Sequence, residues 1–228
     1  MPAKNRNKTF VDHTYYHIYN RGVEKRTIFE DHEDYVAFLG CLKLYLTPPQ
    51  IIDRRFAHTL QGRTLSDAGK TIYAPSRQPN NHGKTIELVA YCLMPNHFHI
   101  LLRSIEKDSM SHFMRSLATR YSMYFNKKYE RVGPLFQGIY KAVMIEHENQ
   151  FLWVTKYIHQ NPHSLVSNIA DYPYSSYANY LGKIHQDWIQ PENILTYFSK
   201  TNPRNSYQNF VDMPLDHPRE NDYLTLDK

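Results

Sequence analysis

The pattern of apolar positions predicts alternating strands and helices. Residues 15–20 (YYHIYN) are aromatic and β-branched, which is typical of a strand, and Arg21-Gly22 ends this run. Apolar residues then recur every three or four positions from residue 35 to 46, which predicts a helix with one apolar face. Asp31 is placed to cap this helix, and Pro48 and Pro49 end it.

The same patterns continue in the second half of the chain. Two apolar runs separated by Pro95-Asn96 predict an antiparallel strand pair, and Ser109 is placed to cap the helix that follows. The further elements that we expect, in chain order, are strands at 86–94 and 97–104, a helix from 109 that breaks at Gly133-Pro134, a strand at 139–145 and a helix at 147–160.

This order of elements predicts an α+β fold. The series β-α-β-β-α-β is that of a ferredoxin-like antiparallel sheet with two helices on one face, and the third helix is an addition. Residues 1–182 are expected to form one domain. An insertion at about 48–84, rich in Pro, Gly, Asn, Arg and Ser, interrupts it, and 183–228 form a C-terminal extension with an acidic tail.

Composition narrows the class of protein. The chain has 27 basic and 22 acidic residues, and the net charge of +5 is a modest indication of a polyanionic partner. Its 19 tyrosines suit base stacking as well as a half-polar core. No apolar run approaches the roughly 20 residues of a membrane span, and the N-terminus lacks a signal-peptide pattern, so we expect no membrane partner and a cytoplasmic location. Cys41 and Cys92 are expected to be buried thiols.

Two histidines supply the first candidate chemistry. His97 and His99 are two apart in a predicted strand, so both imidazoles project from one face while Phe98 points to the other. Two neutral imidazoles suit Mn²⁺ or Zn²⁺, and Mg²⁺ becomes suitable when oxygen ligands complete the shell. A pair of hydrogen-bonded sheet histidines is the alternative interpretation.

Three motifs in order carry a resemblance to a known family. The segment MPNHFHILL (94–102) resembles the signature of the HUH single-tyrosine transposases of bacterial insertion sequences, and most of all their REP-associated relatives. YNRG (19–22) resembles the turn after their first strand, and YIHQNP (157–162) resembles their nucleophile helix. The resemblance extends from about residue 14 to 182, outside the insertion.

The resemblance implies a function and its partners. A protein of this family would bind hairpin or palindromic single-stranded DNA, such as repetitive extragenic elements, and would cleave and rejoin it through a 5′-phosphotyrosine. It would use Mg²⁺ or Mn²⁺, would be a monomer or homodimer, and would act on the bacterial nucleoid.

The resemblance also assigns the reacting residues. Tyr157 would be the nucleophile, and Asn161 would complete the metal site of His97 and His99. Residues four apart on a helix share a face, so Tyr157 and Asn161 can address one site. Pro162 is expected to take Asn161 out of the helical conformation. The alternative for Tyr157 is a tyrosine packed in a helix seam.

Contacts to DNA are expected from a second set of residues. The segment FQGIYK (136–141) resembles a conserved stretch of the family, which implicates Gln137 and Tyr140, although Ile139 stands where relatives often have arginine. A basic residue that relatives have after the nucleophile helix is also missing, and His163 stands nearby. The candidate phosphate contacts are Arg21, Arg103, Arg115, Arg120, Lys127, Lys128, Arg131 and Lys141.

Three other functions remain open. A domesticated repeat-binding protein would keep the fold without cleaving DNA, although the histidines, tyrosine and asparagine are all present. A relaxase usually has a third histidine downstream, which is missing at that place here. A metal hydrolase acting on other substrates would be expected to add a carboxylate-rich ligand set.

Overall fold

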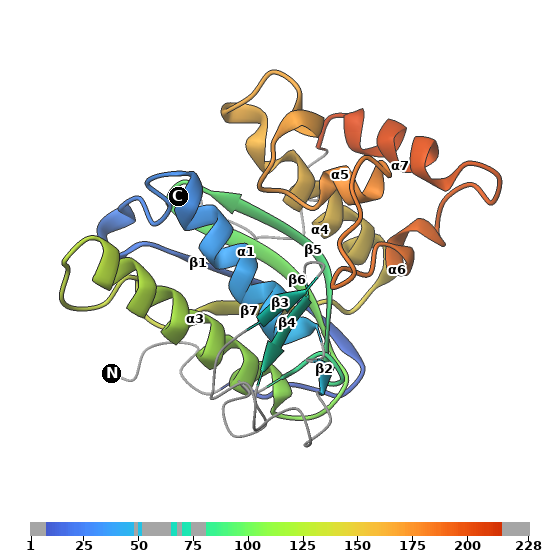
Figure 1. The fold of residues 1–228 in the computed structure, drawn as a ribbon. Coiled ribbons are helices and arrows are strands. Elements are labelled where there is room, and N and C mark those ends of the chain that lie inside the picture. The colour runs from blue at the N-terminus through green and yellow to red at the C-terminus, as the bar shows by residue number, and fades with distance from the viewer. Residues whose placement is uncertain (1–7, 48–49, 52–64, 68–69, 74–80, 216–228) are drawn as a thin grey trace.

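An antiparallel sheet forms the centre of the protein (Figure 1). The structure is a computed structural model that describes residues 8–47, 50–51, 65–67, 70–73 and 81–215. The sheet has the order β5-β6-β1-β7, and each strand is antiparallel to its neighbours. The predicted α+β class is confirmed. The strands are β1 (Thr14–Arg21), β5 (Ile86–Met94), β6 (His97–Ser104) and β7 (Lys141–Met144).

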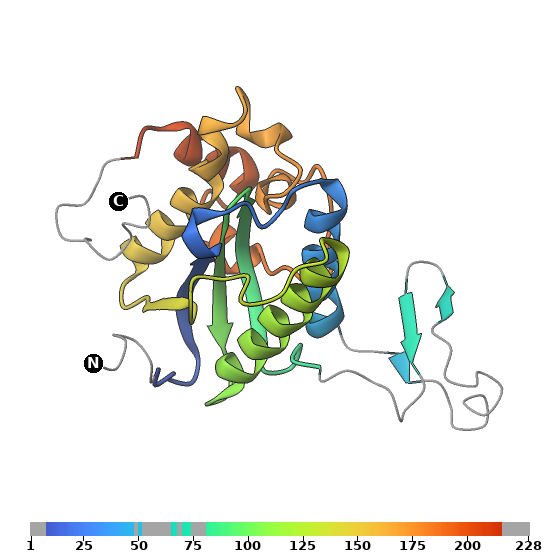
Figure 2. The ribbon, with the colours of Figure 1, turned by 90° about the vertical axis from the view of Figure 1, so that its left-hand side faces the viewer.

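Helices α1 (His32–Leu46) and α3 (Ser109–Lys128) cover one face of this sheet (Figures 1 and 2). Asp31 caps α1 as predicted, in a capping box with Asp34. Ser109 does not cap α3: it lies inside the helix, and its hydroxyl donates to the carbonyl oxygen of Glu106 instead. The core on this face joins the predicted apolar stripes of both helices to the sheet and includes Ile18, Phe38, Leu42, Phe98, Ile100, Phe113, Leu117 and Tyr121.

The opposite face carries α4 (Glu148–Gln160) and the C-terminal helices (Figure 1). These helices are α5 (Tyr177–Tyr180), α6 (Glu192–Leu195) and α7 (Pro203–Asp212). Three 3₁₀ turns complete the main body: η1 (Val23–Lys25), η3 (Asn161–Ser164) and η4 (Ile169–Asp171). No helix in the described ranges is long and apolar enough to cross a membrane.

The C-terminal extension packs into the core as far as α7. Tyr207 and Val211 of α7 are fully buried, in one cluster with Val154 and Ile158 of α4. The extension therefore holds α4 against the sheet. The acidic tail from residue 216 lies outside the described residues, and so does most of the predicted insertion. The parts of the insertion that are described include a small sheet of order β2-β4-β3, made of β2 (Gln50–Ile51), β3 (Leu65–Asp67) and β4 (Lys70–Tyr73).

His159 links α4 to the C-terminal part of the chain. It is fully buried, and its Nδ1 lies 2.6 Å from the hydroxyl of Tyr207 while its Nε2 lies 2.8 Å from that of Ser176. Burial lowers the pKa of His159 to about 3. An unfolded histidine has a pKa of about 6.5, so between these values the unfolded chain binds a proton that the folded chain does not. The stability from the neutral ring is present above about pH 6.5 and is lost as the pH falls toward 3.

A His159→Gln variant should therefore depend less on pH than the wild type. Because one proton changes stability by about 1.4 kcal/mol per pH unit, the wild type should lose about 2 kcal/mol more than the variant between pH 6.5 and pH 5. Urea unfolding at both pH values measures this difference. Equal losses in the two proteins would contradict a neutral, buried His159.

Candidate active site

The turn between β5 and β6 places the paired histidines at the start of a strand. Pro95 and Asn96 form this two-residue turn, and the loop after β1 holds it: Gly22 donates its backbone N–H to the Asn96 carbonyl at 2.9 Å, and Ile28 donates to that of Pro95 at 2.8 Å. A Cβ on Gly22 would lie 2.2 Å from the backbone oxygen of Arg26, so only glycine fits this approach.

His97 and His99 project from the face of the sheet that α4 covers. In the register of the strands, His97 lies opposite Arg21 and His99 lies opposite Tyr19. Phe98 points the other way and packs against Phe38. His99 is fully buried and His97 is partly exposed, so the pair has one enclosed member and one accessible member.

Both imidazoles are held through the same ring nitrogen. Nδ1 of His97 donates to Oδ1 of Asn96 at 2.6 Å, and Nδ1 of His99 lies 2.9 Å from Nε2 of a third histidine, His17. Nε2 is therefore the nitrogen through which either ring could bind a metal. Burial, with His17 and His97 adding to it, lowers the pKa of His99 well below its usual value, which keeps this ring neutral.

A divalent metal fits this pair. Nε2 of His99 is buried and has no hydrogen-bond partner among the residues that the structure describes, and coordination would satisfy it. Within those residues, no three His, Cys, Asp or Glu side chains gather to hold a metal. The remaining ligands would then come from an amide, from water or from a substrate oxygen, as Mg²⁺ and Mn²⁺ prefer.

The structure brings Tyr157 to the histidines. The centre of its ring lies 5.3 Å from the ring centre of His99 and 6.0 Å from that of His17, and both pairs of rings meet edge to face. On its other side it stacks on Trp153 at 5.4 Å, one turn back on α4, and its hydroxyl oxygen is buried. The phenol thus lies beside the buried imidazole of His99, on the face of the sheet from which His97 also projects.

Asn161 is placed beside Tyr157, but its own contact is with the helix. Its Nδ2 donates to the carbonyl of Tyr157 at 2.9 Å, so its Oδ1 is the side-chain atom that could bind a metal. The prediction that Pro162 takes Asn161 out of the helical conformation is wrong: φ and ψ of Asn161 are −48° and −40°. Pro162 is the second residue of η3, in the first turn, where its missing N–H is not needed.

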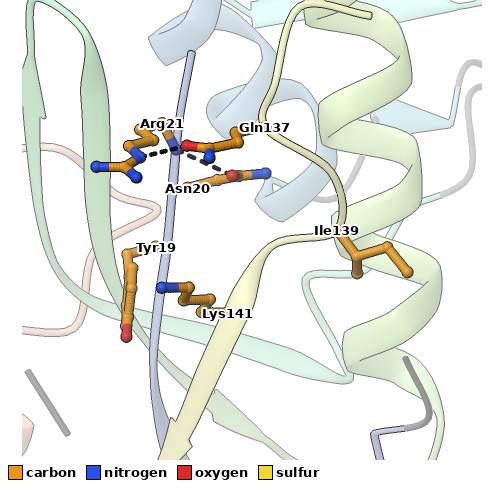
Figure 3. A pocket seen from close by; sticks show the side chains of 6 residues that line it. All are labelled: Tyr19, Asn20, Arg21, Gln137, Ile139 and Lys141. Carbon is orange, nitrogen blue, oxygen red and sulfur yellow. Dashed lines mark hydrogen bonds between the residues drawn. The ribbon is translucent and has the colours of Figure 1, made fainter. Parts of the chain in front are cut away.

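A cationic pocket of ≈ 100 Å³ lies one strand away from the histidines (Figure 3). Arg21 and Lys141 supply its charge, and neither has an ion pair within the described parts of the chain. Arg21 also donates from Nε to Gln137, and the Lys141 ammonium lies 5.6 Å from the centre of the Tyr19 ring. The lining residues are Tyr19, Asn20, Arg21, Gln137, Ile139 and Lys141.

The other predicted DNA contacts lie elsewhere. Lys128 has ion pairs with Asp31, Glu33 and Asp34, so its charge holds the start of α1 to the end of α3. Arg103 has an ion pair with Glu87 near the far end of β6. The remaining predicted contacts are on the α3 side of the molecule. Arg115 and Lys127 are exposed on α3, and Tyr140 lies near Arg115 and Lys8. Arg120 hydrogen-bonds Tyr45, and Arg131 hydrogen-bonds Asn126.

Sequence reasoning missed two residues of the site. His17 and Tyr19 alternate along β1, and Tyr19 lies 5.8 Å from His99, ring centre to ring centre. Their spacing of two was a signal that they share a face. The register that sets this face beside His97 and His99, however, is not visible in the sequence.

Comparison with known proteins gives the chain its relatives. Residues 72–161 match the family model described as "Transposase IS200 like". The resemblance to IS200-like transposases is confirmed. This match spans His97, His99, Tyr157 and Asn161, whereas His17, Tyr19 and Arg21 of β1 precede it. No curated protein matches the chain.

Two solved structures are similar to this chain. One is a REP-associated tyrosine transposase bound to a REP hairpin, with 13% sequence identity and a TM-score of 0.47, over 82% of this chain and 92% of that chain. The other is a candidate transposase from Deinococcus radiodurans R1, with 16% identity and a TM-score of 0.35, over 68% of this chain and 95% of that chain.

Proposed function

We propose that this chain is a metal-dependent endonuclease and strand transferase that acts on single-stranded DNA at hairpins or palindromes. In this proposal Tyr157 is the nucleophile, and His97, His99 and Asn161 hold Mg²⁺ or Mn²⁺. The observation that carries it is the contact of the Tyr157 ring with His99, 5.3 Å between ring centres, inside the segment matched by the transposase family. A tyrosine in a purely structural helix seam would not need to lie against a buried imidazole nitrogen that lacks a partner.

The chemistry follows from the nature of a phenol. The Tyr157 oxygen attacks the scissile phosphorus, a P–O bond to tyrosine forms, and the bond from phosphorus to the 3′ oxygen breaks. The proton that the phenol loses is balanced by the proton that the 3′ oxygen takes up. When a second 3′ hydroxyl attacks the phosphotyrosine, DNA is rejoined and the phenol is released, without an outside energy source. The bound metal supplies polarisation of the phosphate and neutralises negative charge.

The enclosure of the site favours this reaction. His17 and His99 are fully buried, so these two rings form a dry wall beside Tyr157, which is itself partly exposed. A covalent phosphotyrosine must survive until the second DNA end arrives, so a dry surrounding protects it from hydrolysis. His97, at the accessible end and opposite Arg21, marks the side from which DNA would enter.

The cationic pocket supplies a place for the neighbouring phosphate. Arg21 is on β1, the strand next to β6, and Lys141 is on β7, the strand beyond β1. A DNA strand that leaves the histidines across the sheet would therefore reach Arg21 first and Lys141 after it, within about one to two nucleotide steps. Two such contacts to single-stranded DNA account for a salt-dependence slope of roughly 1.4, at about 0.7 for each phosphate.

An Arg21→Ala/Lys141→Ala variant should therefore bind a short single-stranded oligonucleotide more weakly, and its log K against log salt slope should be smaller by about 1.4 than that of the wild type. Fluorescence anisotropy over a salt series measures both quantities. A Lys107→Ala/Lys183→Ala variant removes the same charge beyond the far end of β6 and at the Asp171 ion pair. An equal loss of slope in both variants would contradict the pocket.

Hairpin oligonucleotides labelled at either end test the proposed function. With Mn²⁺ or Mg²⁺ we expect cleavage on one side of the hairpin, a free 3′ hydroxyl on the upstream product and protein attached to the downstream product. EDTA should stop both. Hairpin binding without any cleavage in either metal would overturn the proposal and favour the domesticated DNA-binding function.

A further inference from the structure

His17 is a buried histidine that the proposed chemistry does not use directly. It lies in the middle of β1, is fully buried, and contacts the site through one atom: its Nε2 is 2.9 Å from Nδ1 of His99. Its other nitrogen, Nδ1, is buried and has no hydrogen-bond partner among the described residues. Burial without a partner costs free energy, so this arrangement calls for a compensating role.

The hydrogen bond between the two rings has only two possible directions. If His17 donates from Nε2, then Nδ1 of His99 is the acceptor, and the proton of the neutral His99 ring must be on Nε2, where it blocks a metal. If His99 donates from Nδ1, then its Nε2 has a lone pair, and the proton of His17 is on its own Nδ1. Only the second direction makes His99 a ligand.

His97 has the corresponding hydrogen bond from its Nδ1, to the side chain of Asn96, and its direction is fixed. Oδ1 of Asn96 can only accept, so Nδ1 of His97 must donate and Nε2 of His97 is the ligand atom. The two ligand histidines therefore have matched supports, an amide oxygen for the accessible ring and an imidazole nitrogen for the buried ring. Ligand histidines are generally held by such an acceptor behind the ring.

We propose that His17 is a positioning residue that accepts the Nδ1 proton of His99, and so fixes both the orientation of that ring and the availability of its Nε2 for a divalent metal. This inference rests on the proposed function, since it assumes that His99 binds a metal. His17 itself is not a ligand in this account, because its Nε2 is occupied by His99 and no three-residue metal group exists in the described chain.

Metal binding by the whole protein without DNA tests the inference. We expect His17→Leu to weaken Mn²⁺ binding by about 10- to 100-fold, as loss of such an acceptor generally does. His17→Gln should recover most of this loss, because the amide oxygen of glutamine can accept the same proton. Titration of free Mn²⁺ by electron paramagnetic resonance gives the affinities, and thermal unfolding shows what fraction of each variant is folded.

His159→Leu is the matched control. His159 is equally buried and hydrogen-bonded, but it lies on the outer side of α4, so its loss should lower the melting temperature and leave Mn²⁺ affinity within about twofold. Unchanged Mn²⁺ affinity in folded His17→Leu would overturn the inference alone. A wild type that binds no Mn²⁺ would overturn the proposed function as well.

The tautomer of His99 in the wild-type protein is a second, independent test of the role of His17. Nitrogen-15 NMR of the wild-type imidazoles distinguishes a proton on Nδ1 from one on Nε2. We expect the proton of His99 on Nδ1 and that of His17 also on Nδ1. A proton on Nε2 of His99 in the presence of the diamagnetic ion Mg²⁺ would overturn the inference even if His17→Leu failed to fold.

Discussion

Replacement of Tyr157 by phenylalanine should abolish both DNA cleavage and the covalent adduct, with a loss of rate of about 10³-fold or more. Phenylalanine keeps the stacking on Trp153 and the edge contact with His99, so α4 should stay in place. Only the attacking oxygen is removed. A denaturing gel of labelled hairpin incubated with Mn²⁺ measures product and adduct together, and anisotropy should show unchanged hairpin binding.

Tyr19→Phe is the matched control for this result. The Tyr19 ring also lies beside His99, and its hydroxyl is the nearest rival to that of Tyr157. Burial raises the pKa of Tyr19, which makes it a poorer nucleophile at neutral pH. We expect its variant still to form the adduct, because the attacking oxygen of Tyr157 is kept. If cleavage survives in Tyr157→Phe but is lost in Tyr19→Phe, the nucleophile is Tyr19 of β1 and not Tyr157 of α4.

Loss of both ligand histidines should have the second-largest effect. His97→Ala/His99→Ala should eliminate measurable Mn²⁺ binding and lower metal-stimulated cleavage by about 10²- to 10³-fold, because charge on the phosphate is no longer neutralised. The same variant should still bind hairpin DNA, since the cationic pocket is unchanged. Calorimetric titration with Mn²⁺ and single-turnover cleavage measure the two losses.

Because His99 is fully buried, its replacement by alanine also leaves a cavity, and a second variant must show the effect of such a cavity alone. Cys92 lies opposite His99 on β5 and is also fully buried, and Cys92→Ala opens a small cavity in the same layer without removing a ligand. It should lower stability and preserve Mn²⁺ binding. If the histidine variant cleaves as fast as Cys92→Ala at saturating metal, the histidines do not hold the catalytic ion.

Much of the fold could be predicted because the elements are strongly patterned. The apolar stripes of α1 and α3 and the strand pair around Pro95-Asn96 are local features, and all were found at nearly their predicted limits. The wrong details concern single positions. Ser109 failed as a cap because Asp108, at the cap position, has a left-handed backbone with φ of 64°.

Residues of the site that belong to a sequence motif could be predicted. Residues that reach the site only through the register of the strands could not. His97, His99 and Tyr157 were all identified from sequence, and they lie together. His17 was missed because a diagonal neighbour on another strand depends on the register of β1 with β6. The ion pairs of Lys128 were not visible in the sequence for a similar reason: its pairing with three carboxylates of the α1 N-terminal region is a long-range contact.

Peptide mapping of the trapped adduct tests the central claim most directly. Wild-type protein is incubated with a hairpin oligonucleotide and Mn²⁺, digested with protease and nuclease, and analysed by tandem mass spectrometry. The account predicts a nucleotide joined through its 5′ phosphate to the peptide that contains Tyr157. A nucleotide on Tyr19 or on any other side chain would contradict it.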